Sequence, residues 1–219
     1  MQMFLILPWF MMLFIWKKLI GYIVLAALFI ANMSISFYIS WHYELGTGGI
    51  LPATKIAQDN YQKYYYERPW VRITPYLVGI LFGILYFEYR QEVKKAKDDT
   101  NYYRGTCIYR MFTIAKHHTL MTWIYLLVGF GLTFLCVYVD YSYQRDLATG
   151  WSLTSRCIYN MLVRGLFVWG LCLVLIPMLV GRLTLISDVL GSTIFHVMAK
   201  STYAVYLIHE PLLETFLNS

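Results

Sequence analysis

Two arginines at the start of an apolar segment, Arg68 and Arg72, are the first residues of this sequence that could do chemistry. They stand beside prolines and aromatic rings, and the chain after them is almost entirely apolar. A cation at the point where a helix enters a bilayer can reach the lipid headgroups or hold an anion. The sequence leaves both uses open. Gly79 and Gly83 follow four residues apart, on one helix face, which favours close approach of another helix.

Other candidate residues have a plainer structural explanation. His209 lies within an apolar segment, and its neighbour Glu210 cannot share its helix face. A hydrogen-bonded packing histidine is therefore favoured over a general base. His117 and His118 point to different sides of a helix, which favours a solvated pair over a metal site. Arg164 lies inside an apolar segment, where it either snorkels to the headgroups or meets an anion.

The sequence contains no complete set of residues for a known reaction mechanism. No pair among Cys107, Cys136, Cys157 and Cys172 has metal-ligand spacing. Cys136 and Cys172 are expected to be small packing residues, and the topology below argues against a disulfide between Cys107 and Cys157. There is no Gly-x-Ser-x-Gly elbow, His-Glu-x-x-His or phosphate loop. We predict no catalytic residue, metal or bound cofactor in these residues.

Composition points to a membrane protein. Of the 219 residues, 59% are hydrophobic and only 14% are charged, and the mean hydropathy is +0.53. An ordinary soluble domain exposes far more charge, whereas a chain solvated by lipid can keep apolar side chains on its outside. The net charge of +6 comes mostly from basic residues between apolar runs. This is typical of the positive-inside rule and gives no argument for nucleic-acid binding.

The apolar segments predict an all-α, polytopic membrane protein that forms one membrane domain over residues 1–219. We expect about five to six transmembrane helices and one interfacial helix, since a span needs roughly 20 residues. The expected spans are about 19–40, 73–89, 119–139 and 157–180, with a half-length helix at 1–16 and a last helix at 201–214. Residues 182–199 favour an interfacial amphipathic helix. The tyrosines at 61 and 64–66 favour an interfacial belt over a ligand platform.

Basic residues gather in alternate loops. The strongest cluster follows the span at 73–89 and consists of Arg90, Lys94, Lys95, Lys97, Arg104, Arg110 and Lys116. If this cluster is cytoplasmic, the alternation of spans places Lys17, Lys18, Arg182 and Lys200 on the same face. The organelle stays undetermined.

Three stretches carry a family resemblance. Residues 1–8 read Met-Gln-Met-Phe-Leu-Ile-Leu-Pro, residues 68–79 read Arg-Pro-Trp-Val-Arg-Ile-Thr-Pro-Tyr-Leu-Val-Gly, and residues 202–209 read Thr-Tyr-Ala-Val-Tyr-Leu-Ile-His. In this order they resemble the C-terminal part of the acyltransferase 3 family of membrane acyltransferases, in the branch that includes the nose-resistant-to-fluoxetine proteins. The chain departs from that pattern at Thr74, where the family usually has glycine, and at Glu210, inserted before Pro211.

The resemblance implies transfer of an acyl group, from a donor such as acyl-CoA, to a hydroxyl of a lipid or sugar-like acceptor. It also implies that Arg68, Arg72, Tyr76, Tyr203 and His209 line the donor or acceptor cavity, where arginine forks suit phosphate groups. The family's catalytic histidine and its Arg-x-x-Arg motif lie in earlier helices, and neither can be matched here.

We therefore expect a fragment of an acyltransferase-type helical bundle that lacks the catalytic histidine and is inactive alone. The alternative is a non-catalytic structural or interaction subunit of a membrane complex, whose incomplete helices are completed by membrane protein partners. A third, weaker interpretation is a transporter or lipid-binding relative.

Overall fold

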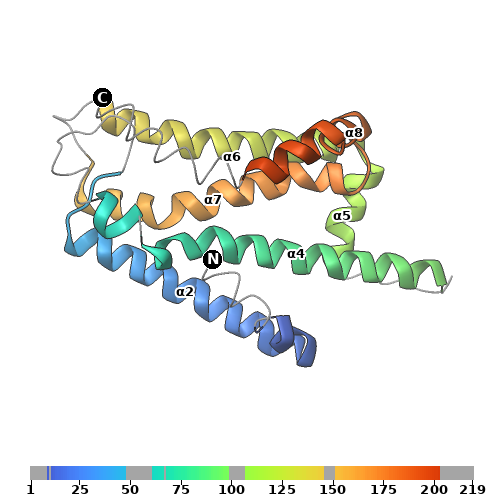
Figure 1. Cartoon of the computed structure of the whole chain (residues 1–219), viewed down its shortest axis with the longest axis horizontal. Coiled ribbons are helices and arrows are strands. Elements are labelled where there is room, and N and C mark those ends of the chain that lie inside the picture. Colours follow the sequence, from blue (N-terminus) through green and yellow to red (C-terminus); the bar gives the residue numbers. More distant parts are fainter. Residues whose placement is uncertain are drawn as a thin grey trace.

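The computed structural model describes residues 9, 11–47, 61–66, 68–98, 107–145 and 151–202. Every regular element in these ranges is helical, which confirms the predicted all-α class. The elements are α2 (Lys18–His42), the π-helical turn η1 (Gln62–Tyr66), α4 (Pro69–Asp98), α5 (Cys107–His117), α6 (Thr119–Arg145), α7 (Leu153–Leu179) and α8 (Thr184–Leu190). Figure 1 shows the four long helices side by side.

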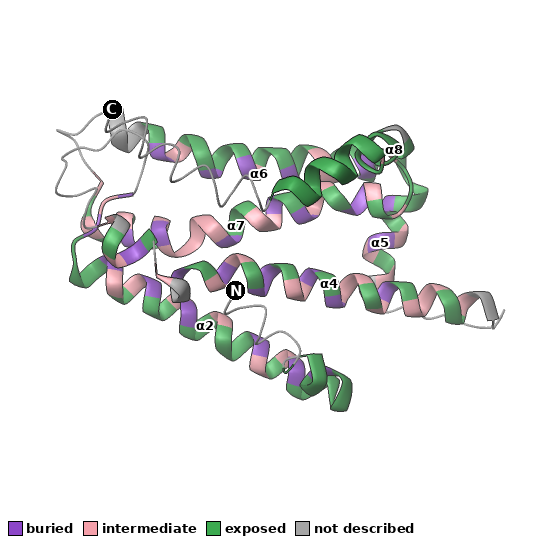
Figure 2. Cartoon of the chain, in the orientation of Figure 1, coloured by how far each residue is buried: buried purple, intermediate pink, exposed green. Residues whose placement is uncertain are grey.

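Four helices of the described chain are long and apolar enough to cross a membrane: Lys18–His42, Val71–Ala96, Thr119–Tyr141 and Leu153–Leu179. At 1.5 Å per residue even the shortest measures about 35 Å, which exceeds the ~30 Å hydrocarbon core. Figure 2 shows exposed residues along all of these helices, and many of them are large and apolar, as lipid solvation allows. The four full-length spans are confirmed, and the predicted total is somewhat higher. The other two predicted helices, 1–16 and 201–214, fall largely outside the described residues.

Three elements differ from the prediction. α4 continues through the charged residues to Asp98, because lysine, arginine, glutamate and alanine are good helix formers. The basic loop after it contains a further helix, α5, whose Phe112 and Ala115 are fully buried. The predicted interfacial helix at 182–199 is two helical segments, α8 and residues 193–202, separated by a turn at Gly191.

α7 is the helix that packs against α2, α4 and α6. α6 and α7 approach each other closely at Gly129 and Gly170, where a Cβ on Gly129 would lie 2.8 Å from the Gly170 carbonyl oxygen. Glycine allows this distance because no side chain separates the backbones. The buried Cys136 and Cys172 are packing residues as predicted, and all four cysteines are free.

A polar junction joins α2, α4 and α7 inside the bundle. The hydroxyl of Thr74 on α4 donates a hydrogen bond to the side-chain carbonyl of Asn32 on α2, and both residues are buried. Gly165 on α7 faces this pair, since a Cβ there would lie 3.2 Å from the Thr74 methyl. Interhelical hydrogen bonds of this kind hold membrane helices together, because lipid supplies no hydrophobic force between them.

The helices place basic residues together at one end of the bundle. Lys18 at the start of α2 forms an ion pair of 3.1 Å with Glu88 on α4. Arg182, after α7, donates a 2.7 Å hydrogen bond to Thr119 at the start of α6. Lys18, Arg90 and Arg182 therefore lie at the same end of the bundle, named here the basic end, as the charge alternation predicts. The opposite end, named here the η1 end, holds η1 and the start of α7 (Figure 1).

Candidate functional site

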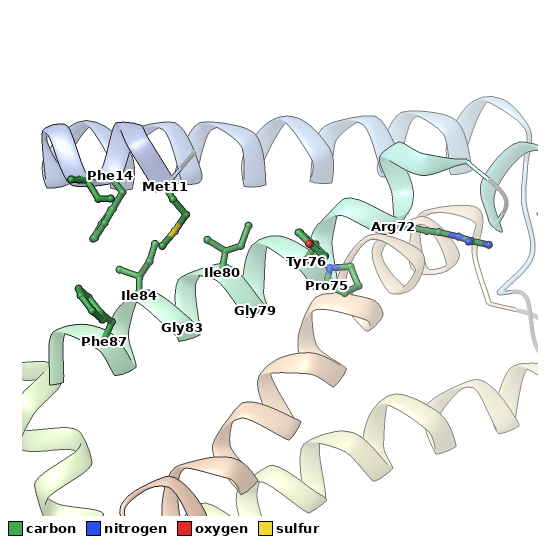
Figure 3. Close-up of a pocket in the computed structure, with 11 residues that line it drawn as sticks. Met11, Phe14, Arg72, Pro75, Tyr76, Gly79, Ile80, Gly83, Ile84 and Phe87 are labelled. Carbon is green, nitrogen blue, oxygen red and sulfur yellow. The ribbon is translucent and has the colours of Figure 1, made fainter. Parts of the chain in front are cut away.

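A groove of about 700 Å³ runs along α4, between this helix and the helical residues 11–16 (Figure 3). One face of α4 lines it, at positions 72, 75, 76, 79, 80, 83, 84 and 87. This i, i+3, i+4 repeat extends for about 22 Å along the helix. Met11, Phe14 and Ile15 form the other wall. The lining is apolar except at the Arg72 end.

The wall at residues 11–16 exists because the chain kinks at Lys17. Lys17 has φ −144° and ψ 108°, which interrupts the helix. Phe14 then packs on the first turns of α2, and the centroids of the Phe14 and Tyr22 rings lie 5.4 Å apart. A Cβ at Gly21 would lie 2.7 Å from the Phe14 ring. Glycine at position 21 therefore lets the segment fold back and form the groove.

The expectation that Gly79 and Gly83 contact another helix is wrong for the described chain. A Cβ added at either position meets no atom within 4 Å. Both glycines lie on the floor of the groove instead (Figure 3). Their missing side chains leave room for a ligand, while the close helix contact is made by Gly129 and Gly170.

Arg72 and Tyr76, two of the site residues expected from the sequence, both line this groove. The Nε of Arg72 donates a 3.0 Å hydrogen bond to the carbonyl of Tyr66, and its guanidinium lies 5.0 Å from the Tyr66 ring centroid. Figure 3 shows the Arg72 side chain at one end of the groove, pointing away from the apolar part. Tyr76, one turn further along α4, is 37% exposed.

Of the other expected site residues, the structure describes Arg68 alone, and it does not bring Arg68 to the groove. The Nε of Arg68 donates a 3.2 Å hydrogen bond to the carbonyl of Lys63, and Arg68 does not line the cavity. Tyr203 and His209 lie outside the described residues.

Arg164 is the functional candidate that sequence reasoning did not place. Its guanidinium lies 5.1 Å from the Tyr65 ring centroid and 5.6 Å from that of Tyr66. The Tyr66 ring thus contacts guanidiniums from α7 and from α4. The sequence shows an arginine inside an apolar helix and a cluster of tyrosines in a loop. It does not show that the arginine and the tyrosines are in contact.

η1 is anchored to α7 by a buried hydrogen bond. The Tyr65 hydroxyl donates to the Asn160 carbonyl at 2.6 Å, and the Asn160 side chain donates to the Gly46 carbonyl at 2.9 Å. Burial raises the pKa of Tyr65 and of Tyr61, although the Arg164 guanidinium acts in the opposite direction. Both hydroxyls therefore stay protonated at neutral pH.

The groove suits binding better than acid–base chemistry. Its described lining contains no carboxylate, imidazole or thiol, and Tyr76 supplies the hydroxyl. Among the residues that the structure describes, no three histidine, cysteine, aspartate or glutamate side chains gather as metal ligands. Comparisons with known protein families, curated proteins and solved structures find no match to the chain. What the groove can bind therefore has to follow from its own shape and charge.

Proposed function

We propose that the chain forms the amphiphile-binding part of a membrane acyltransferase of the acyltransferase 3 type. In this proposal the α4 groove holds the acyl chain of the donor or of the lipid acceptor. One observation carries it: an apolar groove about 22 Å long ends at a single arginine, Arg72. An amphiphile with a long chain and an anionic head has the matching shape and charge.

The arginine has to supply the selectivity. Lipid tails are as apolar as the groove walls, so a chain that leaves the bilayer for the groove gains little hydrophobic free energy. The contact with Arg72, in contrast, is one that bulk lipid does not offer. A charge-assisted hydrogen bond to a guanidinium is roughly twice as strong as a neutral one.

The family resemblance and the groove fall on the same residues. Arg72, Tyr76 and Gly79 belong to the stretch that resembles the family, and all three line the groove. This coincidence supports acyl transfer over other uses of an amphiphile. In this mechanism Arg72 binds the head, the glycine floor receives the chain, and the general base comes from outside the described lining.

Photo-crosslinking tests the binding step. The purified protein in nanodiscs is incubated with a photoactivatable acyl-CoA, and the labelled peptides are identified by mass spectrometry. We expect label on residues 72–87 and 11–16, and at least threefold less label in Arg72→Ala. Arg110→Ala is the matched control, because Arg110 is also exposed but lies on α5. Equal labelling of the exposed α6 face, at Leu127 for example, would overturn the groove as a specific site.

A second candidate function is binding without catalysis, as a subunit of a larger membrane complex. It is favoured by the absence of a general base from the described groove lining. Turnover of labelled acyl-CoA by membranes that contain the assembled protein separates the two. Loss of turnover in Arg72→Ala supports the enzyme, and unchanged turnover despite lost crosslinking supports the binding subunit.

A further inference from the structure

The positive-inside rule does not explain Arg72 and Arg164, which lie at the η1 end of the bundle. That rule accounts for Lys18, Arg90 and Arg182 at the basic end. Arg164 lies eleven residues after Leu153, the first residue of α7, and thus about 16 Å along this apolar helix. A cation at such a position is costly unless it reaches water, headgroups or an anion. Arg72 comes from α4 to the same ring, Tyr66.

The geometry leaves hydrogen-bond donors of both guanidiniums available. Arg72 uses Nε for the Tyr66 carbonyl, and no described residue accepts from its Nη groups. Arg164 lies over the rings of Tyr65 and Tyr66 and also makes a hydrogen bond with the Tyr61 side chain. A guanidinium has five N–H donors, so others remain available. The ion pair of the described chain, Lys18 with Glu88, lies at the other end of the bundle. Neither arginine has a carboxylate partner among the described residues.

We infer that Arg72 and Arg164 together hold a phosphate group, so that the ligand of the groove is a phosphate-bearing amphiphile. This inference rests on the proposed function of the groove and names the head of its ligand. A phosphate monoester carries about −1.5 to −2 charges and three acceptor oxygens. It can therefore accept from two guanidiniums at once, and it offers them more negative charge and one more acceptor oxygen than a carboxylate does. Arg72 lines the groove and contacts Tyr66, so the chain can lie along α4 while the head is at the η1 end.

Lipid headgroups and nucleotide-containing acyl donors both present phosphate, and matched probes distinguish them. Oleoyl lysophosphatidic acid, oleoyl-CoA, oleate and monooleoylglycerol carry the same chain with different heads. Each competes with the photoactivatable label for the protein in neutral-lipid nanodiscs. We expect both phosphate probes to compete at concentrations at least tenfold lower than monooleoylglycerol does. This ratio, the phosphate advantage, should be smaller at high salt, which screens the charges. The tighter of the two phosphate probes identifies the source of the phosphate.

The variants test the two arginines separately. Arg72→Gln and Arg164→Gln are each expected to reduce the phosphate advantage at least fivefold, while Arg110→Gln on α5 retains it. Arg72 is exposed, so its variant is expected to fold normally, and the melting temperature shows whether Arg164→Gln does. If Arg164→Gln unfolds, the result for Arg72→Gln decides.

Two results would overturn the inference, and they differ from a failure of the proposed function. Equal competition by all four probes would remove the phosphate site but leave the groove as an acyl-chain site. A phosphate advantage that persists in Arg72→Gln would place the phosphate elsewhere. If none of the probes competes with the label, the acyl-chain site itself is absent, and the proposed function fails together with the inference.

Discussion

The hydroxyl of Tyr65 donates a 2.6 Å hydrogen bond to the backbone carbonyl of Asn160, one helical turn before Arg164. The Tyr65 ring is only 1% exposed, so this bond lies in the protein interior. It fixes η1 against α7 and thereby sets the position of the next residue, Tyr66. Since Arg72 and Arg164 both contact the Tyr66 ring, one buried hydroxyl supports the whole arrangement.

Replacing Tyr65 with phenylalanine removes this hydroxyl and keeps the ring. We expect the free energy of unfolding to fall by about 1 kcal/mol, the usual net value of one hydrogen bond, measured as thermal stability in detergent. Tyr64→Phe is the control, because the Tyr64 hydroxyl has no hydrogen bond within the described chain and its ring stacks on Tyr43. Equal losses in the two variants would show that the bond to Asn160 is not what stabilises η1.

The same residue predicts an alkaline loss of stability. Burial raises the pKa of Tyr65 above its ordinary value of 10.0. Above pH 10 the unfolded chain therefore releases a proton that the folded chain keeps. The contribution of Tyr65 to the free energy of unfolding is fully present below pH 10 and is lost as the pH rises above it. The slope is about 1.4 kcal/mol per pH unit for each such tyrosine. Melting temperatures from pH 8 to pH 11 should fall less steeply in Tyr65→Phe than in the unmodified protein. Parallel curves would contradict the raised pKa.

The spans were predictable because a bilayer demands long apolar runs, and such runs are local in sequence. The end of α4 was not predictable because its charged residues were read as a loop. α5 was not predictable because it is only 11 residues long, too short to be read as a span, although Phe112 and Ala115 bury one of its faces. The bundle end that collects Lys18, Arg90 and Arg182 was predictable from charge alone.

The candidate site shows where local pattern stops being informative. Arg72 and Tyr76 were identified from their motif, and both line the groove. A pair of glycines four residues apart serves a helix contact or an open groove equally well, so the sequence could not decide for Gly79 and Gly83. The role of Arg164 depends on η1 meeting α7 across 95 residues of sequence between Tyr65 and Asn160.

Gly129 is expected to be intolerant of alanine. A Cβ there would lie 2.7 Å from the Val174 side chain and 2.8 Å from the Gly170 carbonyl oxygen, so α6 and α7 would have to separate. Overpacking of this kind typically costs about 1–3 kcal/mol. Gly131→Ala is the control on the same helix, because a Cβ at Gly131 meets nothing within 4 Å. Thermal unfolding in detergent should show a lower melting temperature for Gly129→Ala only. If both variants behave alike, the close contact of α6 and α7 is not maintained in solution.

Thr74→Val tests the polar junction between α2 and α4. The substitution keeps the shape of the side chain and removes the hydroxyl that donates to Asn32. Interhelical hydrogen bonds within membranes average about 0.6 kcal/mol, so a small but measurable drop in melting temperature is expected. Thr154→Val, at an exposed position of α7, provides the baseline for the same change in chemistry. A larger drop for Thr154→Val would refute the role of the junction.

Gly83→Leu separates binding from stability. The leucine side chain would fill the floor of the groove, and because no atom lies within 4 Å of the added Cβ, the helices need not move. Leucine is also the better helix former, by roughly 0.5–1 kcal/mol relative to glycine. The melting temperature should stay the same or rise, while labelling by the photoactivatable acyl-CoA should fall at least tenfold. Gly131→Leu is the control. An added Cβ at Gly131 also meets nothing within 4 Å, but the residue lies on α6, so labelling should be unchanged. A fall in melting temperature confined to Gly83→Leu would mean that another helix does occupy this face, and retained labelling would mean that the acyl chain lies elsewhere.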